Sequence, residues 1–168
     1  MTELAGKTLL FLACLWLGWD RCRRRSARTA CLRAFRQAVA DLVRELTFSL
    51  APVEDLLERG AAGEGPVPAF FAACRAVYRE TGGESWAESW AAALEIQPLP
   101  LLPSDLPLLA RAGEIIGRWD GAAQEKALGD LLARLDETIF DSAEEAKRLF
   151  RADLALGAAA GAFCVLLL

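Results

Sequence analysis

The sequence predicts an all-α protein, a helical bundle flanked by N- and C-terminal membrane segments. Its 168 residues are rich in Ala, Leu and Arg and contain a single Tyr, a usage that favours helix over sheet. Apolar residues recur every three or four positions through most of the chain, and no useful length of strand-type alternation occurs. The third observation is an uncharged apolar run at each end. The length suits one compact domain.

The N-terminal run, residues 8–19, predicts a transmembrane anchor over residues 1–20. It is shorter than the roughly 18–20 residues that a spanning helix prefers. A signal peptide fits this length, but its basic residues would precede the run, whereas here they follow it. Lys7, Trp16 and Trp19 are suited to the membrane interfaces. The positive-inside rule then places Met1 outside, and the arginines that follow the run, with the body behind them, in the cytoplasm.

A basic collar follows the anchor and precedes an acidic body. Residues 21–36 contain no acid and seven arginines, namely Arg21, Arg23, Arg24, Arg25, Arg28, Arg33 and Arg36. Residues 37–153 contain 21 acidic and 11 basic side chains. Such a run is often a solvated helix face. Because this one follows an apolar run directly, we expect Arg21, Arg23, Arg24 and Arg25 to lie at the membrane interface and attract anionic lipids.

Residues 21–153 are predicted to form a cytoplasmic bundle that begins with a long helix. Apolar spacing predicts a helix over residues 28–50 that continues from the membrane segment and ends before Pro52. A short helix over 53–59, a loop over 60–68 and a helix over 69–79 follow. Ser85 and Glu88 form a capping box for a helix over 86–94, in which Trp86 and Trp90 are expected in the core.

A proline-rich linker over residues 97–107 divides the body. Ser104 or Asp105 is expected to cap the next helix, which reaches Gly117 or Arg118. The last helix carries a coiled-coil-like seam that suits antiparallel packing; its members are Leu128, Leu132, Leu135, Ile139, Ser142, Ala146 and Leu149.

The last helix leads into residues 154–168, predicted to be a transmembrane or membrane-associated segment. At about 1.5 Å per residue this run covers about 22 Å, less than a hydrocarbon core of about 30 Å. Gly157 and Gly161 permit close approach of another helix, and the N-terminal segment with its Gly18 is the expected partner. Alternatively, the tail packs onto the soluble body.

Composition excludes most catalytic chemistry. The chain has no histidine, which removes Ser-His-Asp and Cys-His pairs and His-ligated metals. Its five cysteines form no CxxC pair, so we expect free thiols, no metal site and no cofactor. No phosphate-binding glycine loop occurs. The acidic body and the absence of aromatics within the collar argue against nucleic acid as a partner, and no small-molecule substrate is expected.

One stretch, residues 112–126, has an unusual local character. Gly113 and Gly117 flatten one helix face, and Asp120 lies where its side chain can cap the following helix, which begins with Gln124 and Lys126 in its first turns. The stretch is interpreted either as a tight helix–helix corner or as a corner that docks a partner protein through Glu114 and Asp120.

The same stretch resembles the most specific signature of the stage III sporulation protein AB family, G-E-x-x-G-x-x-D-x-x-x-Q-x-K. Here it consists of Gly113, Glu114, Gly117, Asp120, Gln124 and Lys126 with every spacing kept. The resemblance runs end to end, through the N-terminal glycines Gly6 and Gly18, Phe48 followed by Pro52, the Trp-bearing helix, and the tail from Leu156 to Leu168. Departures are Phe48, where the family often has Tyr, the Ala-rich tail and the proline-rich linker.

The resemblance implies a membrane protein of the mother cell, on its side of the outer forespore membrane, required for spore formation. It implies a soluble domain like that of the inner-membrane platform protein of type II secretion and type IV pilus systems. The implied role is a non-enzymatic platform in the channel between mother cell and forespore. Its implied partners are stage III sporulation protein AA, a secretion-type ATPase, and the other channel components.

Two further hypotheses stay open. In the first, the chain is a cytoplasmic helical adaptor whose terminal apolar runs are core rather than membrane segments. In the second, it is a membrane-bound enzyme or transporter subunit, which would require convergent polar groups inside the bundle.

Overall fold

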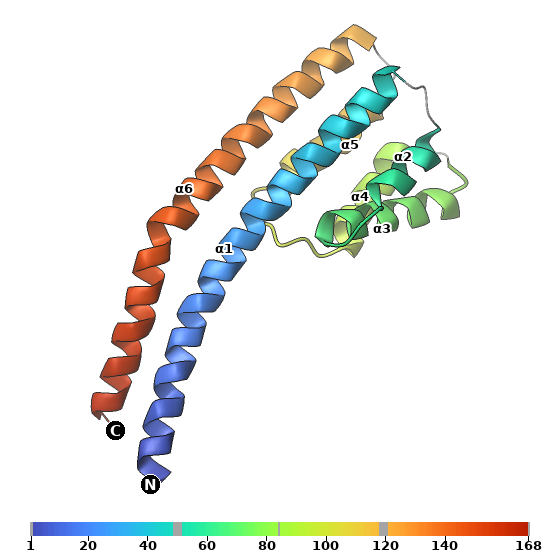
Figure 1. Ribbon diagram of the computed structural model, residues 1–168. Coiled ribbons are helices and arrows are strands. Elements are labelled where there is room, and N and C mark those ends of the chain that lie inside the picture. The colour runs from blue at the N-terminus through green and yellow to red at the C-terminus, as the bar shows by residue number, and fades with distance from the viewer. Residues whose placement is uncertain (1, 49–51, 84, 118–120, 168) are drawn as a thin grey trace. The chain divides into compact units, whose positions relative to one another are not determined.

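The computed structural model describes residues 2–48, 52–83, 85–117 and 121–167, and these residues form helices and no strands (Figure 1). The helices are α1 (Thr2–Phe48), α2 (Val53–Gly60), α3 (Pro66–Glu80), α4 (Trp86–Ile96), α5 (Leu106–Ile116) and α6 (Gly121–Leu167). The predicted all-α class is confirmed. So is the prediction that the first and last helices of the body run unbroken into the apolar ends.

The chain divides into two compact units. One consists of Met1–Thr29 with Phe140–Leu168, which we call the terminal unit; the other is Ala30–Ile139, which we call the central unit. Helices α1 and α6 each belong partly to the terminal unit and partly to the central unit. The predicted membrane boundaries, at residues 20/21 and 153/154, lie within the terminal unit and stay a prediction.

The core of the central unit is built around Trp90 on α4. Its ring centroid lies 5.7 Å from that of Phe35 on α1, 4.9 Å from that of Phe70 and 5.7 Å from that of Phe71, both on α3. The three pairs meet edge to face, an arrangement that aromatic rings prefer. The indole Nε1–H of Trp90 donates to the carbonyl of Leu109 on α5 at 2.9 Å. One side chain thus joins four helices, as its predicted place in the core implied.

The order of packing in the central unit follows the chain, with α2 on α3, α3 on α4 and α4 on α5. The Ser85 cap is confirmed, because its Oγ accepts from the Glu88 amide at 3.3 Å. The predicted start of α3 at residue 69 is wrong, since the helix begins at Pro66. A proline at the first helical position loses no hydrogen bond, and Gly65 with φ 122° turns the chain into the helix.

Asp105 is the residue before α5, as predicted, but its side chain does not cap that helix. Its carboxylate instead accepts from the backbone amide of Leu102 at 2.9 Å, which closes the turn that precedes the helix. Leu99 and Leu101 of the proline-rich linker pack against the core. The linker is therefore held to the central unit by its own apolar side chains.

In the terminal unit the first part of α1 and the last part of α6 lie antiparallel, side by side (Figure 1). A Cβ on Gly18 would lie 2.8 Å from the carbonyl oxygen of Asp153 and 3.6 Å from the Cα of Gly157. A Cβ on Gly157 would lie 3.0 Å from the carbonyl oxygen of Cys14. The predicted partnership of Gly157 with Gly18 is confirmed, because side chains larger than hydrogen would push the two backbones apart.

Of the seven members of the predicted seam of α6, three are buried and the other four are half-buried. Leu128 and Leu135 are buried in the central unit, and Ser142 is buried in the terminal unit. Leu132 is only half-buried, whereas its neighbour Leu131 is fully buried. Within the described residues, no helix combines the length and the apolar character that a membrane crossing requires.

Candidate functional site

The two glycines of the predicted corner lie on the face of α5 that packs on α4. A Cβ on Gly113 would overlap the indole ring of Trp90, and one on Gly117 would lie 3.3 Å from the Cδ1 atom of Trp86. Gly113 is buried and Gly117 half-buried. The interpretation of this stretch as a tight helix–helix corner is therefore confirmed for its glycines, which let α5 approach the two tryptophans of α4.

The charged residues of the corner face solvent where the structure describes them. Glu114 is exposed on α5, and Lys126 is exposed on α6. Asp120 lies outside the described residues, as does the side chain of Gln124, although Gln124 itself belongs to the first turns of α6. The structure thus presents Glu114 beside two packing glycines, and docking through this corner stays a prediction.

The indole nitrogen of Trp86, a ring that approaches Gly117, is a second feature of this corner. It is a buried donor with no acceptor among the residues that the structure describes, whereas the equivalent nitrogen of Trp90 is bonded to Leu109. A buried N–H donor without a partner costs on the order of 1–3 kcal/mol. Within the described residues, the edge where α4 meets Gly117 therefore carries one uncompensated polar group.

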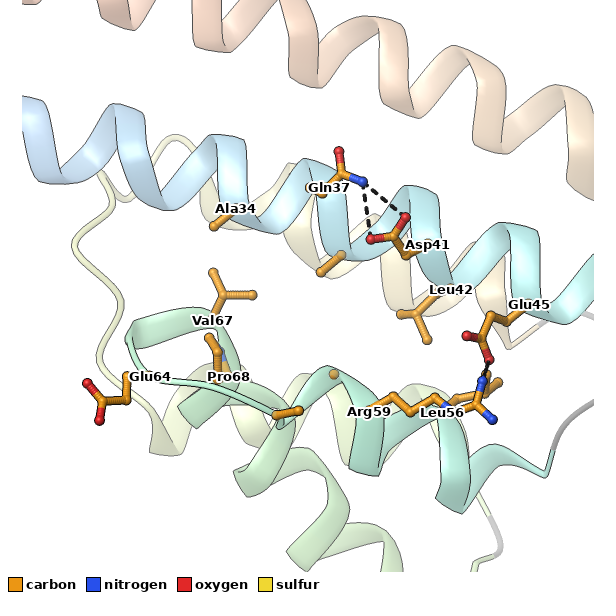
Figure 2. A pocket seen from close by; sticks show the side chains of 13 residues that line it. Ala34, Gln37, Asp41, Leu42, Glu45, Leu56, Arg59, Glu64, Val67 and Pro68 are labelled. Atoms are coloured by element: carbon orange, nitrogen blue, oxygen red, sulfur yellow. Dashed lines mark hydrogen bonds and ion pairs between the residues drawn. The ribbon is translucent and has the colours of Figure 1, made fainter.

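The central unit also contains an open groove of about 530 Å³ that the sequence did not indicate. Figure 2 shows it between α1 on one side and α2 with the start of α3 on the other. Its apolar lining includes Ala38, Leu42, Leu56 and Val67. None of the predicted corner residues lines it. Its lining residues come from helices far apart in sequence, so no local motif could have predicted it.

The rim of the groove is acidic, but most of its charge is already partnered. Asp41 accepts from the Gln37 side-chain amide at 3.0 Å (Figure 2). Glu45 pairs with Arg59, and this carboxylate raises the pKa of the Arg59 guanidinium above its usual value. Glu64 lies exposed on the loop before α3. The groove therefore offers an apolar floor with little free charge.

The predicted interface residues lie in the terminal unit. Trp16 is 65% exposed and Trp19 52% exposed, values unusual for indole rings. Arg21, Arg23 and Arg24 are exposed, whereas Arg25 is half-buried. The side chain of Lys7 lies outside the described part, although Lys7 belongs to α1. The structure thus brings the two tryptophans and the arginines onto successive turns of one helix.

Polar contacts across the terminal unit were not foreseen from the sequence. Arg25 forms an ion pair with Asp153, a carboxylate that is 7% exposed. The hydroxyls of Thr29 and Ser142 lie 2.7 Å apart in the interior, and the Cys22 thiol donates to the Phe150 carbonyl at 4.0 Å. Arg28 lies 3.6 Å from Glu145. These contacts fix which turn of α1 lies beside which turn of α6.

Four cysteines are free thiols, and no group of three His, Cys, Asp or Glu side chains among the described residues could hold a metal ion. Burial raises the pKa of Cys74 to about 12. Burial, reinforced by the Asp105 carboxylate, raises the pKa of Cys31 to about 11. Both thiols are therefore protonated and unreactive at neutral pH.

Replacing Gly113 with alanine is expected to destabilise the central unit. The new methyl group overlaps Trp90, and overpacking of this kind typically costs about 1–3 kcal/mol. Gly129 is the matched control, since it is exposed on α6 with no atom within 4 Å of an added Cβ. Gly129→Ala should stabilise by about 0.4–1 kcal/mol. Urea midpoints of the two full-length variants test this, and equal shifts would contradict the packing role of Gly113.

Alkaline pH is expected to lower stability through Cys31 and Cys74. Their folded-state pKa values lie above the unfolded value of 9.0, so their contribution is complete below about pH 9 and is lost as pH rises toward the folded values. Each thiol should lower the free energy of unfolding by about 1.4 kcal/mol per pH unit in that window. Denaturation at about pH 8 and pH 10 measures this. A double Cys→Ala variant with an undiminished slope would contradict it.

Comparison with known proteins places the chain in a family. The family profile described as stage III sporulation protein AB matches residues 3–168. Stage III sporulation protein AB of Bacillus subtilis (strain 168) is 25% identical over 171 residues, which cover 100% of this chain and 99% of that protein. A solved structure of stage III sporulation protein AB aligns with a TM-score of 0.66 at 23% identity, covering 72% of this chain and 97% of that one. The fold is thus shared, and the chain belongs to the stage III sporulation protein AB family.

Proposed function

We propose that this protein is a non-enzymatic platform of the sporulation channel between mother cell and forespore. In this proposal its two ends anchor it in the outer forespore membrane on the mother-cell side, and its helical body lies in the cytoplasm. The body docks a secretion-type ATPase, stage III sporulation protein AA, and contacts other channel components. Membership of the family supports the sporulation role.

The observation that carries the anchoring role is the concentration of exposed apolar side chains on the paired chain ends. Leu9, Leu12, Trp16 and Leu17 on α1 and Leu156 and Phe163 on α6 are each at least 59% exposed. Soluble monomers rarely present so large an apolar surface, because its contact with water is unfavourable. A lipid environment removes that cost.

The short apolar runs define the form of the anchor. At about 1.5 Å per residue, residues 8–19 rise about 18 Å and residues 154–168 about 22 Å, against a hydrocarbon core of about 30 Å. We infer that the two runs enter the membrane together as an antiparallel pair of helices. They either insert partway or thin the bilayer locally. The approach of Gly18 to Gly157 supports entry as a pair.

The absence of a spanning helix among the described residues favours the alternative function, a helical adaptor whose ends are not membrane segments. In that case another protein would have to cover the exposed leucines and tryptophans of the terminal unit. The two functions differ in where the protein is found in the cell.

Cell fractionation distinguishes the two functions. The full-length protein should sediment with membranes, resist extraction by high salt and alkaline carbonate, and be released by detergent, because the hydrophobic contribution of its ends does not depend on ionic strength. Recovery in the soluble fraction without detergent would contradict the platform and favour the adaptor. An Asp substitution at Leu9 and Leu12 should shift the protein toward the soluble fraction.

The docking corner is tested by reversing the charge of Glu114. Glu114→Arg should leave helicity and melting unchanged, because the side chain is exposed. Binding to the purified ATPase should weaken at least about tenfold, since like charges across an interface cost several kcal/mol. Glu137→Arg on α6 is the matched control, with the same charge change at another exposed site. Equal affinities for the two variants would show that the corner is not the docking surface.

A further inference from the structure

The register of the terminal unit brings basic residues from the two chain ends to one level. The contact of the Cys22 thiol with the Phe150 carbonyl marks that level. Arg21 and Arg23 flank Cys22 in sequence, and Arg148 and Arg151 lie within two residues of Phe150. Two residues correspond to about 3 Å of helix rise. The four guanidinium groups therefore originate from a layer about one helical turn thick.

Four of the acids close to this layer pair with other bases, and a fifth, Asp141, lines an open surface hollow together with Arg148 and Arg151. Asp20 accepts from Arg24 at 2.7 Å, Glu144 lies 3.1 Å from Lys147, and Glu145 lies 3.6 Å from Arg28. The fourth acid, Asp153, pairs with Arg25. These pairs use local bases other than the four that share the level of Cys22.

Four arginines thus keep free positive charge, and we call them the guanidinium band: Arg21, Arg23, Arg148 and Arg151. All four are exposed, and none forms an ion pair within the part of the chain that the structure describes. Two of the four arginines lie on α6, and the N-terminal basic collar did not predict them as part of the same surface.

The band lies at the edge of the exposed apolar surface. On α1 it begins two residues after Trp19, and on α6 it ends three residues before Leu154, where the uncharged run starts. Neighbouring residues on a helix point about 100° apart, so Arg21 and Arg23 point about 200° apart. The band therefore distributes its charge around the helix pair rather than converging on one small anion.

We propose that the guanidinium band binds the phosphate groups of anionic phospholipids, with phosphatidylglycerol as the test lipid. This inference rests on the proposed anchoring role. Guanidinium groups suit phosphate because their planar fork donates two parallel hydrogen bonds. A charged band next to an apolar pair of helices matches the order of layers at a membrane surface, where the phosphates lie just outside the hydrocarbon.

Co-flotation of the full-length protein with vesicles tests the band. One vesicle preparation contains phosphatidylcholine alone, and the other contains phosphatidylglycerol as a minor part of the same mixture. The wild type should bind the anionic vesicles more tightly, and raised salt should reduce that preference. Each guanidinium removed should weaken binding to anionic vesicles about fivefold, so Arg148→Ala/Arg151→Ala should lose about 25-fold. Its affinity for neutral vesicles should not change.

Arg33→Ala/Arg134→Ala is the matched control, because it removes one exposed arginine from α1 and one from α6 outside the terminal unit. If it weakens binding to anionic vesicles as much as Arg148→Ala/Arg151→Ala, only net charge matters and the band is wrong. Inorganic phosphate at matched ionic strength should compete no better than chloride. Stronger competition would indicate a site for free phosphate and would overturn the lipid assignment, as would preferential binding of the band to single-stranded RNA.

The same experiment separates this inference from the function on which it rests. Flotation of all variants with both kinds of vesicle at equal affinity would retain the anchor and reject the band. Failure of the wild type to float with either kind would reject both.

Discussion

The central unit depends on the complete burial of one indole ring. Trp90 is enclosed by Phe35, Phe70 and Phe71, and its N–H is satisfied by the Leu109 carbonyl. Burial of 150–250 Å² of aromatic surface is worth about 4–6 kcal/mol, and an unbonded indole N–H would offset on the order of 1–3 kcal/mol of that. The ring is accommodated because Gly113 presents no side chain to it. Helices α1, α3, α4 and α5 are thereby positioned around a single residue.

Local rules predicted most of the helices of this protein. The three-to-four spacing of apolar residues located α1 and α6, and the Ser85 cap located the start of α4. The same rules placed the start of α3 too late, because a proline was interpreted as part of a loop when it opens the helix. Asp105 was expected to cap α5, yet its carboxylate bonds the turn before the helix. Both differences concern residue types, Pro and Asp, that are common both in loops and at the start of helices.

Contacts between distant parts of the sequence could be predicted only where small residues indicated that two helices approach closely. Gly18 and Gly157 were paired correctly, because close approach of two helices requires glycine on both sides. No sequence signal indicated that Arg25 pairs with Asp153 or that Thr29 contacts Ser142, because these residue types are common on any helix. For the candidate corner, the sequence correctly predicted that the two glycines allow close helix packing. Docking of a partner through Glu114 stays a prediction. The pair of half-buried Arg25 with buried Asp153 fixes the register of the two helices, because breaking it would leave the Asp153 carboxylate buried without a partner.

The pairing of the first and last helices has a consequence for how the protein is made. The N-terminal part of α1 leaves the ribosome first, but the α6 groups that meet Gly18, Cys22, Arg25 and Thr29 lie at residues 142–157. Synthesis therefore leaves this face of α1 uncovered until residues 142–157 have been made. A chain truncated before residue 142 lacks every one of these partners, so this face of its α1 stays uncovered.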